Sequence, residues 1–306
     1  MRYLCRALAT APPQAARREF GRAAIAWAAL RPGEWIKNFL VFAPLLFSGH
    51  VDEGAALAKA GLVFAAFCAM SSAGYLFNDL RDVELDRRHP VKAARPIASG
   101  QLGEGLAAGV AATLAAAGLA LAAPVGWRAV GVVGAYGALT AAYTLYLKQL
   151  VIIDVMTIAA CFVARVLAGA VAIDVTASRW LIVCTGMLAL FLGFTKRRQE
   201  ATSEEHFAPD SRPVLEHYSL PFLDQMVSLV TGATLISYVI YATDSPLVGD
   251  RMLVTVPCVA YGMFRYLYLI YERRDTRSAP TLLTRDPGLI GAMAAWVAVA
   301  LLAIYL

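Results

Sequence analysis

The stretch AALAKAGLVFAAFCAMSSAGYLFNDLRDVELD, residues 55–86, joins a long apolar run to a group of three aspartates. The apolar part is long enough to cross a hydrocarbon layer roughly 30 Å thick, for which a helix needs about 20 residues. Similar apolar runs recur along the whole chain of 306 residues, which is 59% hydrophobic and 16% charged. The sequence therefore predicts an all-α integral membrane protein.

Apolar windows separated by turn-forming or charged segments predict nine transmembrane helices. We expect these helices at residues 24–48, 55–80, 103–122, 128–147, 149–173, 180–195, 219–243, 252–271 and 287–306. Residues 1–22 are expected to form a cytoplasmic tail, and residues 23–306 are expected to form a single transmembrane catalytic domain.

Lysine and arginine residues favour one set of alternate segments between the predicted helices. Of the 27, nineteen lie in the N-terminal tail and the segments on its side, whereas three lie in the opposite loops. Cytoplasmic loops carry such an excess of basic residues, so the N-terminus and the long loops at 81–100 and 196–217 are predicted to face the cytoplasm. The net charge of +5 thus reflects membrane orientation and does not indicate nucleic-acid binding.

The three aspartates at the end of the second predicted helix share one helical face. At 100° per residue, Asp79 and Asp86 lie about 60° and 40° from Asp82, and Asn78 lies about 40° on its other side. Carboxylates this close repel one another unless a cation neutralises them. Hard oxygen ligands suit Mg²⁺, with Mn²⁺ as the alternative ion. We therefore predict a catalytic metal site at Asp79, Asp82 and Asp86.

A basic loop that contains prolines follows the aspartates directly. Its cations Arg87, Lys92 and Arg95 suit the outer oxygens of a metal-bound diphosphate. The alternative is a solvated helix end whose acids are balanced by ordinary cytoplasmic basic residues. Four polar groups on one face, with a basic loop beside them, favour a binding site over that alternative.

Further polar residues are expected near the same cytoplasmic-side cavity. Pro32 and Gly33 should break the first helix close to Lys37. Asp154 and Arg165 are eleven residues apart and share one face of the fifth helix within about 20°, although a structural ion pair or carbonyl capping explains Arg165 equally well. The expected substrate contacts are Lys37, Asn78, Arg87, Lys92, Arg95, Lys148, Arg165, Lys196, Arg197, Glu200 and Tyr218.

Three motifs carry a resemblance to a known family. They are RPGEWIKN at residues 31–38, the NDxxDxxxD pattern within residues 78–100, and KRRQE at residues 196–200. Together they resemble the UbiA-type intramembrane prenyltransferase superfamily and, within it, the branch that contains decaprenyl-phosphate phosphoribosyltransferase. The resemblance implies nine helices around a cytoplasmic-side cavity, in the bacterial cytoplasmic membrane.

The resemblance also implies a reaction. In it, a Mg²⁺-dependent enzyme moves the 5-phosphoribosyl group from 5-phosphoribosyl diphosphate to a polyprenyl phosphate, in cell-envelope synthesis. Members that use prenyl diphosphates carry a second DxxxD motif after helix six, whereas this chain has that spacing only at Asp82 and Asp86. Lys196, Arg197 and Glu200 stand there instead, which favours a more anionic substrate pair over prenyl transfer to an aromatic acceptor.

Two questions stay open at the level of sequence. Spacing does not decide which basic residues bind the lipid phosphate and which bind the ribose 5-phosphate. The sequence is also compatible with a homo-oligomer.

A secondary transporter is the alternative from another class of protein. Transporter sites tend to lie near the midplane at broken helices, whereas these aspartates lie at the cytoplasmic boundary.

Overall fold

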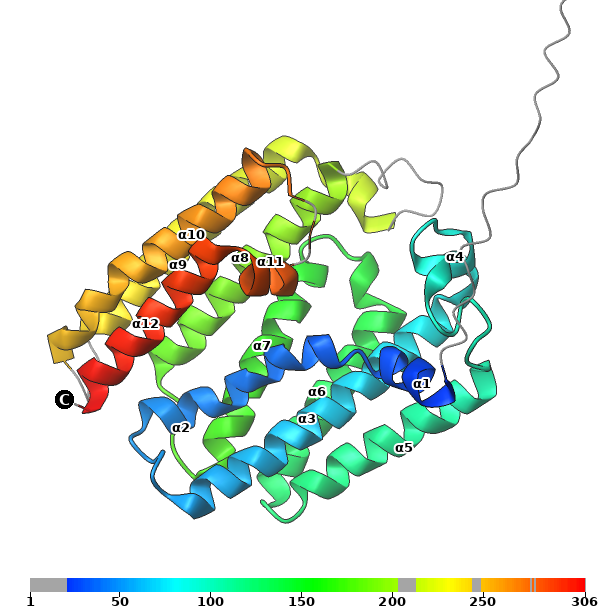
Figure 1. Ribbon diagram of the computed structural model, residues 1–306, viewed down its shortest axis with the longest axis horizontal. Coiled ribbons are helices and arrows are strands. Elements are labelled where there is room, and N and C mark those ends of the chain that lie inside the picture. Colours follow the sequence, from blue (N-terminus) through cyan, green and yellow to red (C-terminus); the bar gives the residue numbers. More distant parts are fainter. Residues whose placement is uncertain (1–20, 203–212, 244–248, 276, 278, 306) are drawn as a thin grey trace, which may run out of the picture.

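The computed structural model describes residues 21–202, 213–243, 249–275, 277 and 279–305, and it forms a bundle of helices with no strand in these ranges (Figure 1). The expected tail at residues 1–22 lies outside the described residues except for its last two. Within the described part, six helices are long and apolar enough to span a membrane, so the chain is an integral membrane protein. They are α3 (Gly54–Arg81), α5 (Glu104–Ala122), α7 (Ile153–Ala172), α8 (Arg179–Thr202), α9 (Leu220–Thr243) and the continuous segment Asp250–Tyr271.

The segment Asp250–Tyr271 is built from η6 (Gly249–Thr255) and α10 (Val256–Tyr271). The three other expected spans have helices at their positions, but these fall short of the six in length or hydropathy. They are the broken series α1 (Arg22–Leu30), η1 (Pro32–Phe42) and α2 (Ala43–Phe47), then α6 (Trp127–Leu145), and finally α12 (Pro287–Tyr305).

Short helices connect these elements. They are α4 (Val83–Arg88), η2 (Lys92–Ala94), η3 (Leu147–Gln149), η5 (Pro213–His217) and α11 (Ala279–Arg285). One boundary differs from the sequence prediction in a way that affects the site. The sixth span was expected to end at residue 195, but α8 continues to Thr202 and carries the polar KRRQE segment as helix.

The first segment of the chain is broken at Arg31, as the sequence predicts. Arg31 has φ 53° and ψ 58°, which is the left-handed region, and Pro32 follows it. A residue before proline is disfavoured in the right-handed helical region, so α1 ends there and η1 begins in a new direction. The break leaves the side chain of Arg31 beside α3.

The bundle has two main apolar cores. One joins α3, α6 and α7 around Phe67 and Val133, and the other joins α8, α9 and α10 around Phe191 and Leu223. Figure 1 shows α3 and α5 together on one flank and α9, α10 and α12 together on the other. Between η1, α2 and the C-terminal helices lies an apolar cavity of about 860 Å³, whose lining includes Phe39, Phe47, Leu188, Tyr241, Met263 and Trp296.

Gly169 of α7 lies directly against the backbone of η1. A Cβ atom at this position would overlap the carbonyl oxygen of Val41 and would lie 3.2 Å from Cδ of Pro44. Because backbone cannot yield as a flexible side chain does, we expect Gly169→Ala to lower the free energy of unfolding by about 1–3 kcal/mol. Thermal unfolding in detergent measures this effect.

The matched control for this prediction is Gly109→Ala in α5. No atom lies within 4 Å of a Cβ built at Gly109, and alanine has the higher helix propensity, so this variant should be neutral or slightly stabilising. Equal unfolding midpoints for Gly169→Ala and the wild-type chain would contradict the close packing of α7 on η1.

Candidate functional site

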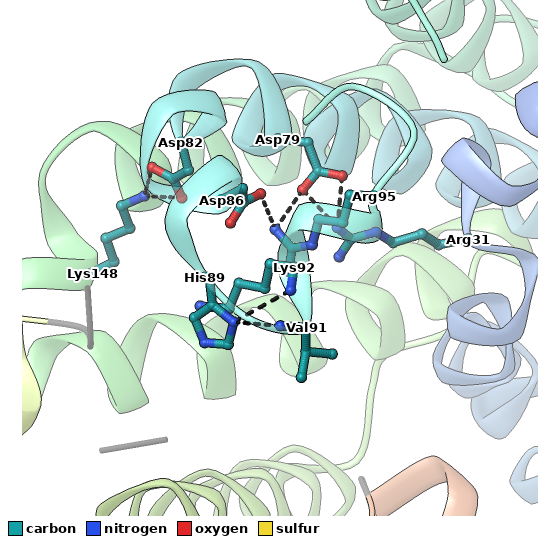
Figure 2. A network of polar contacts seen from close by, with 9 residues as sticks. All are labelled: Arg31, Asp79, Asp82, Asp86, His89, Val91, Lys92, Arg95 and Lys148. Carbon is teal, nitrogen blue, oxygen red and sulfur yellow. Dashed lines mark hydrogen bonds and ion pairs between the residues drawn. The ribbon is translucent and has the colours of Figure 1, made fainter. Parts of the chain in front are cut away.

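The three aspartates lie at the junction of α3 and α4 (Figure 2). α3 ends at Arg81, and Asp82 interrupts the helix with φ −99° and ψ 11° before α4 begins. The prediction that all three aspartates share one continuous helical face is therefore wrong, because it assumed an unbroken helix from Asn78 to Asp86. Asp79 and Asp86 are buried and lie near each other, whereas half-buried Asp82 points the other way.

Two arginines neutralise the buried pair of aspartates. Nη2 of Arg31 donates to both carboxylate oxygens of Asp79, at 2.6 and 2.7 Å. Nη1 of Arg95 donates to Oδ1 of Asp79 at 3.0 Å and to Oδ2 of Asp86 at 2.5 Å, so one nitrogen bridges two carboxylates. Burial raises the pKa of Asp86, and the charges of Arg95 and Lys92 offset part of that rise.

Asp82 has a separate cationic partner, which comes from the connection between α6 and α7. Lys148 lies in η3, between α6 and α7, and its Nζ donates to both oxygens of Asp82 at 2.7 Å. The two residues are 66 positions apart in the chain. Both side chains keep some exposure, 18% for Lys148 and 21% for Asp82, so this ion pair lies at the edge of the site.

The loop after α4 is held by a histidine that the sequence analysis did not assign to the site. Nδ1 of the buried His89 accepts hydrogen bonds from the backbone N–H groups of Val91 and Lys92, at 3.2 and 3.3 Å (Figure 2). The N–H of Arg95 then donates to the carbonyl of Lys92 at 2.9 Å. This chain of bonds shapes the turn that brings Arg95 back over Asp79 and Asp86.

Arg87 and Asn78 take positions at the margin of the cluster. The exposed Arg87 donates to Glu84 at 2.6 Å and to Glu104 at 2.9 Å, and neither of these partners is one of the three aspartates. Asn78 is half-buried, and its carbonyl accepts the N–H of Asp82 at 3.0 Å. Its backbone therefore closes the last turn of α3.

A second polar row runs from Asp79 to Lys37 through residues that the sequence analysis did not place in the site. The guanidinium of Arg31 lies 5.1 Å from the ring centre of Tyr75. The hydroxyl of Tyr75 donates to Glu34 at 3.4 Å, and Nζ of Lys37 donates to the same carboxylate. Arg31 and Glu34 both belong to the RPGEWIKN motif, and membership of that motif could have identified them as site residues.

A buried cluster joins α7, α8 and the residue after η5. Nε of Arg197 lies 2.9 Å from Oδ2 of Asp154, and neither side chain is exposed. Tyr218 donates to the other oxygen of Asp154 at 2.7 Å, and Glu200 forms an ion pair with Nη1 of Arg197. Lys196, on the exposed side of α8, lies 3.9 Å from Glu200.

Arg165 lies within the apolar core that joins α3, α6 and α7, against the rings of Phe67 and Tyr136. Its guanidinium donates to Asn38 at 2.7 Å, to the carbonyl of Cys161 at 2.6 Å and to the hydroxyl of Tyr136 at 3.0 Å. Since all three nitrogens have protein partners, its contacts match the structural alternative that the sequence left open.

The three aspartates supply carboxylate oxygens, the type of ligand that Mg²⁺ prefers. Within the described ranges no group of three His, Cys, Asp or Glu side chains converges as a ready metal site, because Asp82 faces Lys148 and not its neighbours. Yet each of the three carboxylates already holds a cationic nitrogen at 2.5–3.0 Å. Binding of Mg²⁺ here would require these nitrogens to give up carboxylate oxygens, which are the hard donors that the ion prefers.

Comparisons with known proteins agree on one family. The model of the UbiA prenyltransferase family matches residues 39–285. A decaprenyl-phosphate phosphoribosyltransferase of Corynebacterium glutamicum is 36% identical over 220 residues, which cover 71% of this chain and 66% of that protein. The protein of the same name from Mycolicibacterium smegmatis is 35% identical over 228 residues, covering 73% of this chain and 72% of that one.

A solved structure shares the fold. The UbiA homolog from Archaeoglobus fulgidus bound to GPP and Mg²⁺ superposes with a TM-score of 0.73 at 19% sequence identity. The match covers 92% of this chain and 100% of that one. At this identity the likeness establishes the arrangement of helices.

Proposed function

Because this chain belongs to the UbiA prenyltransferase family, an enzyme family of membrane proteins, we propose that it is a polyprenyl-phosphate phosphoribosyltransferase. It moves the 5-phosphoribosyl group from 5-phosphoribosyl diphosphate to a polyprenyl phosphate and releases diphosphate. The proposal rests on one observation, which is that Asp79, Asp82 and Asp86 form a cluster of ion pairs with Arg31, Arg95 and Lys148. The names of the two bacterial relatives support the choice of substrates.

We assign the metal to the three aspartates. Asp79, Asp82 and Asp86 would hold Mg²⁺, or Mn²⁺ in its place, together with the donor diphosphate. When bound, the metal supplies positive charge that stabilises diphosphate as a leaving group. Arg31, Arg95 and Lys148, which neutralise the carboxylates in the chain alone, are the groups placed to contact phosphate oxygens.

The basic residues of the chain contribute electrostatic stabilisation of their own. The bond from the ribose carbon to the diphosphate oxygen breaks, the electron pair leaves with diphosphate, and a lipid phosphate oxygen forms the new bond. Fixed guanidinium and ammonium groups stabilise the charge that develops on the leaving group. Since the lipid phosphate is already ionised, no general base is required. We assign the remaining phosphates to Lys92 in η2, Lys37 in η1 and Lys196 in α8.

The missing second acid pair supports an anionic acceptor. Where prenyl-diphosphate enzymes would carry DxxxD, α8 has Lys196, Arg197 and Glu200. Arg197 and Glu200 belong to the buried cluster with Asp154, so their role in binding is to fix the wall of the site. Exposed Lys196 is the member of the segment that can meet a phosphate.

The apolar cavity between η1 and the C-terminal helices supports a lipid acceptor. It is about 860 Å³ in volume, and its lining is made almost wholly of aliphatic and aromatic side chains. A polyprenyl tail placed there would keep its phosphate near Lys37, which lies on the adjoining helix η1. We place all nine expected spans in a bacterial cytoplasmic membrane, with the aspartate cluster facing the cytoplasm.

A donor comparison tests the proposed function. We expect purified protein with Mg²⁺ to release diphosphate from 5-phosphoribosyl diphosphate only when a polyprenyl phosphate is present, with formation of the phosphoribosyl lipid. Prenyl diphosphate with an aromatic acceptor should give no product. Diphosphate release from the prenyl donor, and not from 5-phosphoribosyl diphosphate, would reject the proposal.

Lys37→Met should lower turnover about 10–100-fold, since it removes a charge-assisted phosphate contact.

A further inference from the structure

Ile152 has a backbone conformation that a β-branched residue rarely adopts. Its φ is 70° and its ψ is −46°, directly before the first residue of α7. A residue of this type at positive φ is a genuine outlier, and it persists only where the surroundings hold it. Such strain concentrates at functional sites, so the residues that hold Ile152 are informative.

Tyr218 holds this turn through its hydroxyl group. The N–H of Ile152 donates to the Tyr218 oxygen at 2.6 Å, and the same hydroxyl donates to Oδ1 of Asp154 at 2.7 Å. Burial and the bond to Asp154 raise the pKa of Tyr218, so its proton is retained for that bond. Tyr218 is only 5% exposed, and the buried Arg197 holds Asp154 from its other oxygen.

The strained turn connects α7 to the segment that carries Lys148. η3 ends three residues before Ile152. Backbone hydrogen bonds between residues close in sequence stiffen the connection on both sides of Ile152. Leu150 donates to Leu147 at 3.2 Å, Asp154 donates to Leu150 at 3.0 Å, and Met156 donates to Ile152 at 2.9 Å. A change in φ at Ile152 would therefore swing η3 relative to α7 and move Lys148 away from Asp82.

We propose that Tyr218 is a positioning residue whose hydroxyl holds the turn at Ile152, so that Lys148 reaches the diphosphate site. This inference rests on the proposed function, because it takes Lys148 as a diphosphate contact. It assigns Tyr218 no contact with substrate, since both hydrogen-bonding directions of its hydroxyl are already used inside the protein.

A double-mutant cycle tests the proposal with a binding measurement. The probe is inorganic diphosphate with Mg²⁺, titrated calorimetrically into the full-length protein in detergent. We expect Lys148→Met to weaken binding about tenfold or more and Tyr218→Phe to weaken it about fivefold to tenfold. If Tyr218 acts through Lys148, the double variant should bind no more weakly than Lys148→Met alone. Multiplying effects would overturn the proposal.

A rescue experiment separates positioning from general packing. Glycine adopts positive φ without strain, so Ile152→Gly should keep the turn in place when the hydroxyl is absent. We expect Tyr218→Phe with Ile152→Gly to bind diphosphate within about twofold to threefold of the wild-type protein. Failure of the glycine variant to restore binding, in protein that unfolds at the wild-type temperature, would reject the assignment of Tyr218.

Tyr271→Phe is the matched control. Tyr271 also donates its hydroxyl to a carboxylate, Asp224, at 2.8 Å, and its ring lies against Arg198 of α8. Its effect on diphosphate binding should be small and should multiply with that of Lys148→Met. If Lys148→Met leaves diphosphate binding unchanged, the positioning role of Tyr218 fails, whereas the proposed reaction is judged separately by formation of the phosphoribosyl lipid.

Discussion

Asp82→Asn should lower turnover by about 10²–10³-fold while leaving the fold intact. The substitution keeps the size of the side chain but removes a negative oxygen pair that the proposed Mg²⁺ and Lys148 both require. The Asp82–Lys148 pair is partly exposed, and pairs of this kind contribute about 0–1 kcal/mol to stability. The measurements are product formation at saturating Mg²⁺ and the thermal unfolding midpoint.

Asp82 is a better test of the site than Asp79. Asp79 is buried and paired with both Arg31 and Arg95, so replacing it removes the carboxylate that holds Arg31 and should also disturb the fold. Glu84→Gln is the matched control, because Glu84 lies on α4 close to Asp82 but has an exposed side chain that pairs with Arg87. This control should retain activity, and an active Asp82→Asn variant at saturating Mg²⁺ would contradict the metal assignment.

The helical layout was largely predictable because apolar length is a local property of the chain. Each of the six long apolar helices lies at an expected span, and the break after Arg31 follows from the proline and glycine that succeed it. The end of α3 at Arg81 also agrees with the predicted end at residue 80, but the projection of the three aspartates wrongly continued one helix through Asp86. Local patterns failed at one boundary, because α8 runs past residue 195, where charge suggested a loop.

The partners in the site were predictable only as a group. The sequence placed acids and bases at one end of the bundle, but Arg31 meets Asp79 across 48 residues and Lys148 meets Asp82 across 66. Such pairs depend on how the helices pack against one another, and the spacing of residues along the chain does not reveal that packing. For the same reason Asp154 and Arg165, which share a helical face, contact different partners at different depths of α7.

The pair of Arg197 and Asp154 should have the largest effect on stability. Both side chains are fully buried, and Nη2 of Arg197 has no hydrogen-bond partner within the described structure. Removing one member of a buried ion pair leaves an uncompensated charge and typically costs about 3–5 kcal/mol. We expect Arg197→Met to lower the thermal unfolding midpoint in detergent by on the order of 10 °C.

The double variant decides whether charge is the cause. Asp154→Asn keeps an acceptor for the hydroxyl of Tyr218, so Arg197→Met combined with Asp154→Asn removes both buried charges and preserves that hydrogen bond. If the loss in Arg197→Met comes from an unpaired carboxylate, the double variant should recover most of the midpoint. Arg87→Met, which breaks only exposed ion pairs, should change the midpoint little. Equal midpoints for the single and double variants would show instead that α8 depends on the volume of Arg197, and the wall of the site would then be held by packing and not by charge.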